Sequence, residues 1–379
     1  NPILTILQLP KKLRITVPGP KYDMTLSRSD RLRQKALLFT EGAMIISRNS
    51  DIRWLTGFSG SSGAVLITNS EVHVFTDGRY TEQVARETIG CLTHIDQGNA
   101  VSNAAKYAHG IGIRGLQIQW EDLSHAAVQK LTREFPELKL EDFKYKIDRF
   151  RGVKEDFEQD TILRALRITE QTLSDCLPLV QEGMSELALA AEIDYTQRKL
   201  GAEKSSFETI VAFGAQTALP HARPGNNKLK RGEPILLDFG CVVDGYASDM
   251  TRMAHYGPPS PEFSNTYEIV LQALNKATAC AQAGITGKEL DETARHLFRK
   301  EGLESFFSHS LGHGVGLDIH EWPAVSSRNE EELPLGSVIT LEPGLYFPGQ
   351  YGIRIENMVR LDSVGCTTLN TLTTNLIVL

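Results

Sequence analysis

Four acidic residues in the second half of the chain each lie beside a short apolar stretch. They are Asp238 in Leu237-Asp238-Phe239, Asp249 before Met250-Thr251-Arg252, Glu342 after Ile339-Thr340-Leu341, and Glu356 after Gly352-Ile353-Arg354-Ile355. A single acid in such a stretch is best interpreted as half of a buried salt bridge, because an unpaired buried charge is expensive. Four converging carboxylates need cations, and a pair of divalent ions meets that need.

His313 is a fifth candidate ligand. It lies in a segment that contains three histidines, His309, His313 and His320, beside several glycines. A lone histidine is more often structural or solvated than a ligand, but neighbouring glycines let other groups approach closely. Four carboxylates and one imidazole form a mainly hard ligand set, which favours manganese or cobalt, with zinc or iron as alternatives. The set differs from three-ligand catalytic zinc sites, and HExxH is absent.

This combination of groups predicts hydrolysis of an amide bond. Two metals roughly 3.5 to 4 Å apart can hold a bridging water as hydroxide and polarise the scissile carbonyl. A carboxylate must then move a proton to the leaving nitrogen. Imidazoles can hold the developing oxyanion. The sequence supplies all three kinds of group.

The elements that must position these residues repeat along the chain. Gly183-Met184-Ser185 and Gly284-Ile285-Thr286 each open a predicted helix, and His221-Ala222-Arg223-Pro224 matches His320-Glu321-Trp322-Pro323. The stretch 232–240 matches 336–344, at offsets of about 100 residues. A duplicated unit of a helix and strands ending in an acid would fold as two facing halves with a site between them. The repeat sets Asp238 opposite Glu342, and His221 opposite His320.

Local patterns sharpen this expectation. Val242-Val243-Asp244-Gly245-Tyr246 is typical of a hairpin turn on Asp-Gly, so Asp238 and Asp249 lie on paired strands and can converge. Alternation along 352–356 directs Arg354 and Glu356 to one face and Ile353 and Ile355 to the other. From Lys154 a long helical pattern begins, with its apolar side on Ile162, Ala165, Leu166 and Thr169.

The first half of the chain predicts a separate α/β domain. A helix over 30–42 precedes a buried strand at 43–46, and 64–67 and 72–75 form a hairpin. The charged segment 144–152 marks the boundary. We therefore divide the chain into an uncertain leader (1–23), an N-terminal domain (24–150) and a catalytic domain (151–379), and we base no function on the leader.

Composition narrows the class of protein. The chain has 379 residues, with 41% hydrophobic and 23% charged residues, which is ordinary for a globular protein of two domains. Its net charge of −7 argues against a nucleic-acid partner. No apolar stretch near the start is long enough for a membrane span or a signal segment. Five scattered cysteines without a CxxC pair favour a reducing, cytoplasmic setting.

The segments LLDFG, SDMTR, GHGVGLDIHE, LEPG and GIRIEN resemble the metallopeptidases of pita-bread fold, which include methionine aminopeptidase, Xaa-Pro aminopeptidase and Xaa-Pro dipeptidase (prolidase). The resemblance covers about residues 154–379. It implies that Asp238 chelates one metal, that His313 and Glu342 chelate the other, and that Asp249 and Glu356 bridge both. It further implies that Glu342 shuttles the proton.

The resemblance also assigns substrate contacts. His221 and His320 would contact the scissile carbonyl and neighbouring groups, and His309 would help hold the proline. Arg354 would orient a ligand carboxylate or the substrate, with partnership to a neighbouring acid as an equal alternative. Two departures from the family are Asn357, where aspartate is common, and Trp322, which is expected to alter the substrate pocket.

The N-terminal half narrows the family. Thr56–Gly63 and the following Thr76-Asp77-Gly78-Arg79-Tyr80 resemble the N-terminal domain of Xaa-Pro peptidases and creatinase, which methionine aminopeptidases usually lack. The resemblance implies a creatinase-like N-terminal α/β domain, a pita-bread (duplicated α+β) catalytic domain and a homodimer.

The expected activity is that of an Xaa-Pro aminopeptidase, acting on peptides with proline second through a hydroxide between two metals, with Mn²⁺ favoured. A prolidase shares every catalytic residue and stays open as an alternative. A basic group closing the cleft on the substrate carboxylate would favour the prolidase. A creatinase-like metal-free hydrolase and an inactive binding protein are disfavoured because all five ligands are present.

Overall fold

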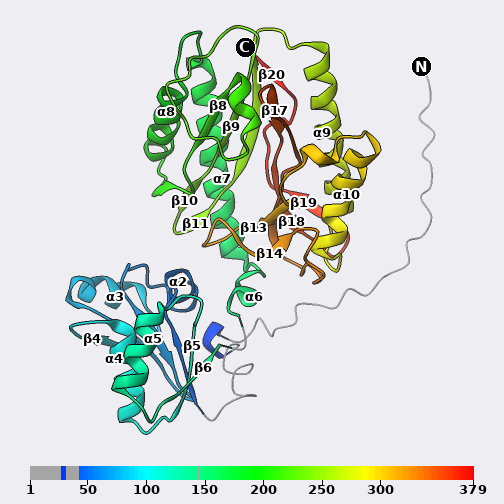
Figure 1. The fold of residues 1–379 in the computed structure, drawn as a ribbon. Coiled ribbons are helices and arrows are strands. Elements are labelled where there is room, and N and C mark those ends of the chain that lie inside the picture. The colour runs from blue at the N-terminus through cyan, green and yellow to red at the C-terminus, as the bar shows by residue number, and fades with distance from the viewer. Residues whose placement is uncertain (1–26, 31–41, 144–145) are drawn as a thin grey trace, which may run out of the picture.

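The computed structural model describes residues 27–30, 42–143 and 146–379, which form two domains joined by a short helix (Figure 1). The leader 1–23 and most of the helix predicted over 30–42 lie outside the described residues. Among the described helices, none has the length and apolar character needed to cross a bilayer. All five cysteines are described and are free thiols.

Within residues 42–143, six strands form one sheet in the order β4-β3-β2-β1-β5-β6, with β1–β2–β3 antiparallel and the outer pairs parallel. Ile46 faces one apolar cluster and Ile45 the other, so the centre of the sheet is covered on both faces, and the central strands β1 and β2 are apolar throughout. The strands are β1 (Ala43–Ile46), β2 (Ala64–Ile67), β3 (Val72–Thr76), β4 (Leu92–Ile95), β5 (Gly115–Ile118) and β6 (Lys139–Asp142). The helices are α2 (Asn49–Thr56), η1 (Gly78–Tyr80), α3 (Thr81–Glu87), α4 (Ala100–Gly110) and α5 (His125–Glu134).

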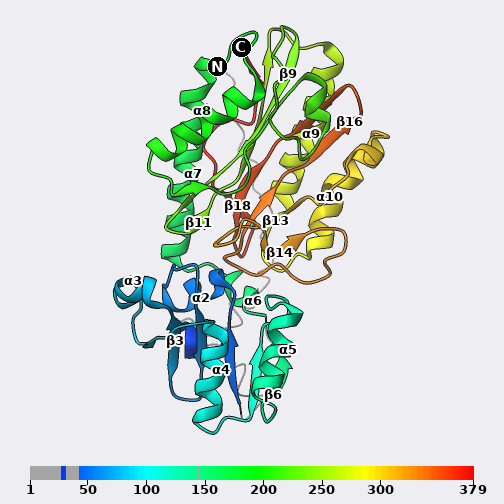
Figure 2. The ribbon, with the colours of Figure 1, turned by 60° about the vertical axis from the view of Figure 1, so that its left-hand side comes forward.

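The second domain contains two similar halves that lie side by side (Figures 1 and 2). In Figure 2, α7 and α8 flank one side of the strands, and α9 and α10 flank the other. The helices are α6 (Asp148–Arg151), α7 (Asp156–Cys176), η2 (Leu177–Leu179), α8 (Glu186–Lys199), η3 (Gly214–Ala218), α9 (Pro261–Cys280), α10 (Gly287–Lys300) and η4 (Glu304–Phe306).

Strands of both halves lie between these helices. The strands of the first half are β7 (Lys204–Ser205), β8 (Ile210–Phe213), β9 (Glu233–Phe239), β10 (Cys241–Val243), β11 (Tyr246–Ala247) and β12 (Met250–Tyr256). The strands of the second half are β13 (Gly312–Gly314), β14 (Glu321–Val325), β15 (Val338–Leu341), β16 (Gly344–Phe347), β17 (Tyr351–Arg354), β18 (Asn357–Leu361) and β19 (Cys366–Thr368). The last strand, β20 (Ile377–Val378), pairs with β12 of the first half.

The duplication predicted from the sequence is present in the backbone. Ser185 caps α8 and forms an isolated bridge with Lys228, while Thr286 caps α10 and forms the equivalent bridge with Glu332. Each cap hydroxyl accepts a hydrogen bond from the third helical residue, which satisfies one of the free N–H groups of the first turn. The antiparallel pairs β9–β12 and β15–β18 are also equivalent. The two halves therefore bring the ends of β9 and β15 toward a common centre.

The predicted Asp-Gly hairpin joins β10 to β11. Asp244 has φ 44° and Gly245 has φ 80°, the left-handed pair that a two-residue hairpin turn requires. The hairpin returns the chain to β12, where Thr251 lies opposite Asp238 of β9. This register carries Asp249, just before β12, to the same end of the sheet as Asp238.

Trp322 lies at the junction of the two domains. A Cβ atom on Gly152 would come within 2.3 Å of the Trp322 ring, so only glycine fits there. The Arg149 guanidinium lies 4.4 Å from the ring centroid, and the indole Nε1 donates to Glu331. The expectation that Trp322 shapes the substrate pocket is wrong, because its ring fills the interdomain contact and is not part of the site cavity.

Candidate metal and active site

Three buried carboxylates form the centre of the site. Asp238 lies on β9, Asp249 directly precedes β12, and Glu356 lies between β17 and β18. Each offers an oxygen atom, and these atoms all lie within 4.8 Å of one another. The three residues are at most 8% exposed. The structure thus brings together three of the five ligands proposed from the sequence at the distances that one or two shared cations would need.

Two oxygens of this cluster lack any hydrogen-bond partner among the described residues. They are Asp238 Oδ1 and Glu356 Oε1, and both are inaccessible to solvent. Buried polar atoms are rarely left unsatisfied unless an ion or a water meets them. Oxygen-rich sites of this kind suit hard or borderline divalent ions. The donor set therefore fits a divalent metal site.

His313 and Glu342 complete the predicted set on the second half of the domain. His313 Nε2 lies 3.3 Å from Glu342 Oε1 and 3.6 Å from Asp249 Oδ2. The Thr340 hydroxyl donates to Glu342 Oε1 at 3.2 Å and accepts from the backbone N–H of His313 at 3.0 Å. Strand β15 thereby aligns the imidazole and the carboxylate with the three-carboxylate cluster.

The protonation of these acids reflects their crowding. Burial, together with the charge of Glu342, raises the pKa of Glu356 to about 8. Burial and the neighbouring Glu356 raise the pKa of Asp249 well above its usual range. Burial opposes ionisation of Glu342 too, but the hydrogen bond to His313 lowers its pKa to about 2. Without cations the cluster holds protons, and bound metals would replace them.

This crowding predicts how the metal-free protein responds to pH. In the unfolded chain a glutamate titrates near 4.3, whereas folded Glu356 titrates at about 8. Between these values the folded state binds more protons, so the free energy of unfolding falls as the pH rises. Glu342 contributes with the opposite sign, and its stabilisation is lost only as the pH falls below about 4.3 toward 2.

Thermal unfolding of chelator-treated protein, measured from about pH 5 to about pH 8, where folded Glu356 holds its proton and an unfolded glutamate does not, tests this effect. Glu356→Gln, which removes one of the titrating groups, should flatten the decline. A wild-type slope no steeper than that of Glu356→Gln would contradict the account.

Arg354 lies under the carboxylate cluster. Its Nη2 donates to Asp238 Oδ2 at 2.5 Å, and its Nε donates to the Thr251 hydroxyl at 3.1 Å. Its Nη1 donates to the Tyr346 hydroxyl at 2.7 Å and to the Pro220 carbonyl at 3.1 Å. Arg354 therefore bonds a carboxylate that is itself a proposed ligand, so this contact fits both expectations for Arg354, orientation of a ligand carboxylate and partnership with a neighbouring acid.

A cavity of about 510 Å³ opens over these groups and is lined by residues of both halves. His221, His309 and His320, the three predicted substrate contacts, all line it. The rings of His313 and His320 lie 4.3 Å apart, edge to face. His309 Nε2 bonds the Tyr346 hydroxyl at 2.8 Å, and burial lowers its pKa, so the ring is neutral near pH 7. The cavity places three imidazoles around the carboxylates.

Sequence reasoning missed three hydroxyl groups that orient the charged side chains. They are Thr251, which donates to Glu356 Oε2 at 2.8 Å, Thr340 and Tyr346. Thr251 and Thr340 lie on buried strands, each two residues from a proposed ligand. A buried hydroxyl in such a strand must find a partner, and this signal could have identified both. Tyr346 offers no comparable signal in the sequence.

Comparison with known families identifies the chain. The sequence pattern of metallopeptidase family M24 matches residues 160–363, which contain every proposed ligand. The chain belongs to metallopeptidase family M24. The pattern of the creatinase/prolidase N-terminal domain matches residues 28–153 of this M24 peptidase. The predicted fold, a creatinase-like domain followed by a pita-bread catalytic domain, is confirmed.

Relatives of this M24 peptidase include proteins named as Xaa-Pro peptidases, some of them with solved structures. The Xaa-Pro dipeptidase of Pyrococcus horikoshii is 33% identical over 331 residues, which are 86% of this chain and 92% of that protein. The solved X-Pro aminopeptidase of Thermotoga maritima is 36% identical with a TM-score of 0.85, over 93% of this chain and 100% of that one. The Xaa-Pro dipeptidase of Bacillus anthracis is 31% identical with a TM-score of 0.89, over 93% and 99%.

Membership of M24 establishes a hydrolase of the metallopeptidase class and implies a dinuclear metal site. The domain boundary between 150 and 151 stays a prediction, and it falls within helix α6. The homodimer and the cytoplasmic location also stay predictions.

Proposed function

We propose that this M24 peptidase is an Xaa-Pro aminopeptidase, which hydrolyses the bond between an N-terminal residue and a following proline. The observation that carries the proposal is the convergence of Asp238, Asp249 and Glu356 with the His313–Glu342 pair at the floor of one cavity. The named relatives act on Xaa-Pro substrates, which supports the choice of scissile bond.

The charged groups of the cavity favour an aminopeptidase over a dipeptidase. A dipeptidase must bind the carboxylate of its second residue, and a buried guanidinium or ammonium is the usual partner. Among the described residues that line the cavity, the Arg and Lys side chains are Arg354 and Arg223. Arg354 is buried and already uses four of its five N–H donors within the protein, one of them on Asp238. Arg223 is 83% exposed and lies 3.6 Å from Glu208. A peptide that continues past proline needs no such partner.

The roles of the residues follow from their positions. A bound divalent pair supplies a nucleophile from water near neutral pH and polarises a carbonyl. Glu342 lies at the cavity surface, 17% exposed, where its carboxylate can accept a proton and deliver it to the leaving proline nitrogen. His221 and His320 can donate hydrogen bonds to the scissile carbonyl, and neutral His309 can contact the proline ring.

The metals are proposed to be manganese, with cobalt, zinc or iron as alternatives, because the ligands are four carboxylates and one imidazole. The ligand pairing proposed is Asp238 on one metal, His313 and Glu342 on the other, and Asp249 and Glu356 on both.

An Xaa-Pro dipeptidase is the second candidate, favoured by the named dipeptidases at 31 and 33% identity. The test is to compare Ala-Pro with Ala-Pro-Ala, and to use Ala-Ala-Ala and an N-acetylated tripeptide as controls. We expect release of alanine from Ala-Pro-Ala, a lower kcat/KM for Ala-Pro, and no cleavage of either control. Cleavage of Ala-Pro alone would make the protein a dipeptidase, and cleavage of neither proline substrate with any of the four metals would refute both candidates.

A further inference from the structure

Arg151 is a buried cation between the two domains. It ends α6, the short helix that joins them (Figure 1), and its side chain is 2% exposed. On one side, Nη1 donates to Asp51 Oδ1 at 2.7 Å and to Ser50 Oγ at 2.9 Å. On the other side, Nη2 donates to Asp318 Oδ2 at 2.8 Å and bonds Glu321. One guanidinium thus connects the N-terminal domain to the catalytic domain.

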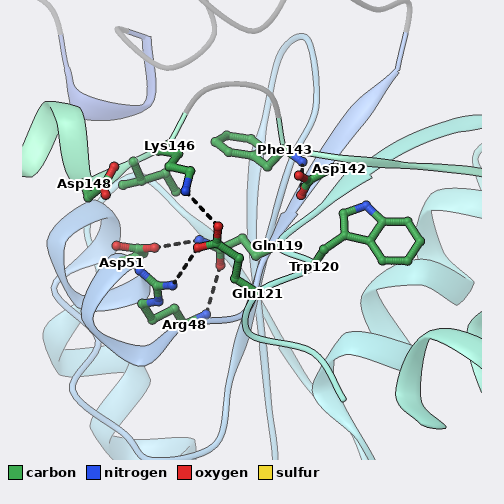
Figure 3. Close-up of a pocket in the computed structure, with 10 residues that line it drawn as sticks. Arg48, Asp51, Gln119, Trp120, Glu121, Asp142, Phe143, Lys146 and Asp148 are labelled. Carbon is green, nitrogen blue, oxygen red and sulfur yellow. Dashed lines mark hydrogen bonds and ion pairs between the residues drawn. The ribbon is translucent and has the colours of Figure 1, made fainter. Parts of the chain in front are cut away.

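The N-terminal partner of Arg151 is itself firmly held. Gln119 Nε2 donates to the second oxygen of Asp51 at 2.6 Å, and Figure 3 shows the Gln119 amide directed at Asp51. Gln119 Oε1 accepts from the backbone N–H groups of Ser47 and Arg48. The adjoining cavity measures about 40 Å³, room for little more than a water molecule. Asp51 is therefore held by hydrogen bonds within the N-terminal domain as well as by Arg151.

The catalytic-domain partners of Arg151 flank His320. Asp318 lies two residues before it and Glu321 directly follows it. Glu321 is 3% exposed and also accepts from Lys154 Nζ at 2.6 Å. Ser50 Oγ donates to Asp318 Oδ2 at 2.8 Å. The segment 315–321 that carries His320 is thus bound on both sides of the histidine by groups anchored outside it.

We infer that Arg151 is a positioning residue for His320. His320 lines the site cavity, and its ring lies 4.3 Å from that of His313. Arg151 holds the two acids on either side of His320 against Asp51, so the N-terminal domain helps to fix a substrate-contacting imidazole. The inference rests on the proposed peptidase function of the cavity.

The chemistry of arginine explains why this position carries it. The planar guanidinium offers donors in several directions and stays charged when buried. Its loss would leave Asp51 buried without its cation and Glu321 with Lys154 alone. Buried acids without a cation draw in water or move toward solvent, and either response shifts the segment 315–321. A lysine would keep the charge but not the planar, forked set of donors that reaches both domains.

The test compares Arg151→Met with Arg149→Met. Arg149 lies on the same helix and also reaches across the junction, where it pairs with Glu331 and stacks on the Trp322 ring, both outside the segment 315–321. We expect Arg151→Met to lower kcat for Ala-Pro-Ala by about 10- to 100-fold, because small displacements of a substrate-contacting group have effects of this size. KM should change much less, Arg149→Met should stay near wild type, and Arg151→Lys should recover part of kcat.

Two further measurements separate positioning from simple stabilisation. In a His320→Ala background, Arg151→Met should lower kcat by no more than about two-fold, because coupled residues are not additive. Hydrogen exchange of residues 315–321 should accelerate in Arg151→Met but not in Arg149→Met. Equal exchange in both variants, or full additivity with His320→Ala, would overturn the inference. If the wild-type protein cleaves no proline peptide, the proposed function fails, and hydrogen exchange still decides the positioning role.

Discussion

Glu342→Gln is expected to lower kcat for Ala-Pro-Ala by about 10²- to 10⁴-fold, the range of a lost general acid–base group. The glutamine amide keeps the size of the side chain and one carbonyl oxygen, but it cannot carry a proton between water and the leaving nitrogen. It also ends the charge pairing with His313, whose Nε2 lies 3.3 Å from Glu342 Oε1. The measurement is steady-state kinetics at saturating metal, so that weaker metal binding does not contribute.

Glu332→Gln is the matched control for this variant. Glu332 is an exposed glutamate in the same domain, and its backbone forms the bridge with Thr286. Its neutralisation should leave kcat at the wild-type value. A Glu342→Gln enzyme that retained more than about a tenth of wild-type kcat would show that another group transfers the proton.

Asp249→Asn is expected to abolish tight binding of at least one metal ion and, with it, activity. Asp249 is 5% exposed and contributes one of the three clustered carboxylate oxygens. The neutral amide is a much weaker ligand for a hard cation. Burial, and then like-charge repulsion from Glu356 and Asp238, raise the pKa of Asp249 in the wild-type protein. The neutral asparagine removes both costs of holding a charge at this position. The metal-free variant should therefore unfold at or above the temperature of metal-free wild type.

Asp249→Asn should thus weaken metal binding without lowering the melting temperature of the metal-free protein, and a merely destabilising substitution would not have both effects. Added metal should raise the melting temperature of wild type, because a ligand that binds only the folded state stabilises it. The rise in Asp249→Asn should be smaller. Asp244→Asn is the matched control, because Asp244 lies in the exposed hairpin turn five residues earlier. Its melting temperature should rise with added metal as much as that of wild type. A metal-free Asp249→Asn protein that melts well below wild type would mean that Asp249 is a structural ion-pair partner.

Much of the site could be predicted because its determinants are local. The Asp244-Gly245 turn fixes the hairpin that precedes β12, so strand pairing alone carries Asp249 toward Asp238. The repeat then supplies the second half by symmetry, including Glu342 at the end of β15. The alternation along β17 placed Ile353 in the apolar core, with Arg354 facing the cavity.

The features that could not be predicted depend on residues far apart in the sequence. Arg354 bonds Asp238, which lies 116 positions away in the sequence. Whether Arg354 contacts an acid or the substrate therefore depends on the tertiary structure. Trp322 follows a histidine of the site, yet its ring lies against Gly152 because α6 passes there. Arg151 binds Asp51 and Asp318 at separations of 100 and 167 residues. No local pattern encodes how two domains dock, so these contacts require the three-dimensional structure.

The proposal of a two-metal exopeptidase is tested most directly by titrating metal-stripped protein with Mn²⁺. Bound metal and the release of alanine from Ala-Pro-Ala are measured on the same samples. The account predicts no release before metal is added and full activity only as the second equivalent binds. It also predicts that Asp249→Asn binds fewer ions and stays inactive throughout. Undiminished hydrolysis by protein shown to contain no metal would contradict the central claim.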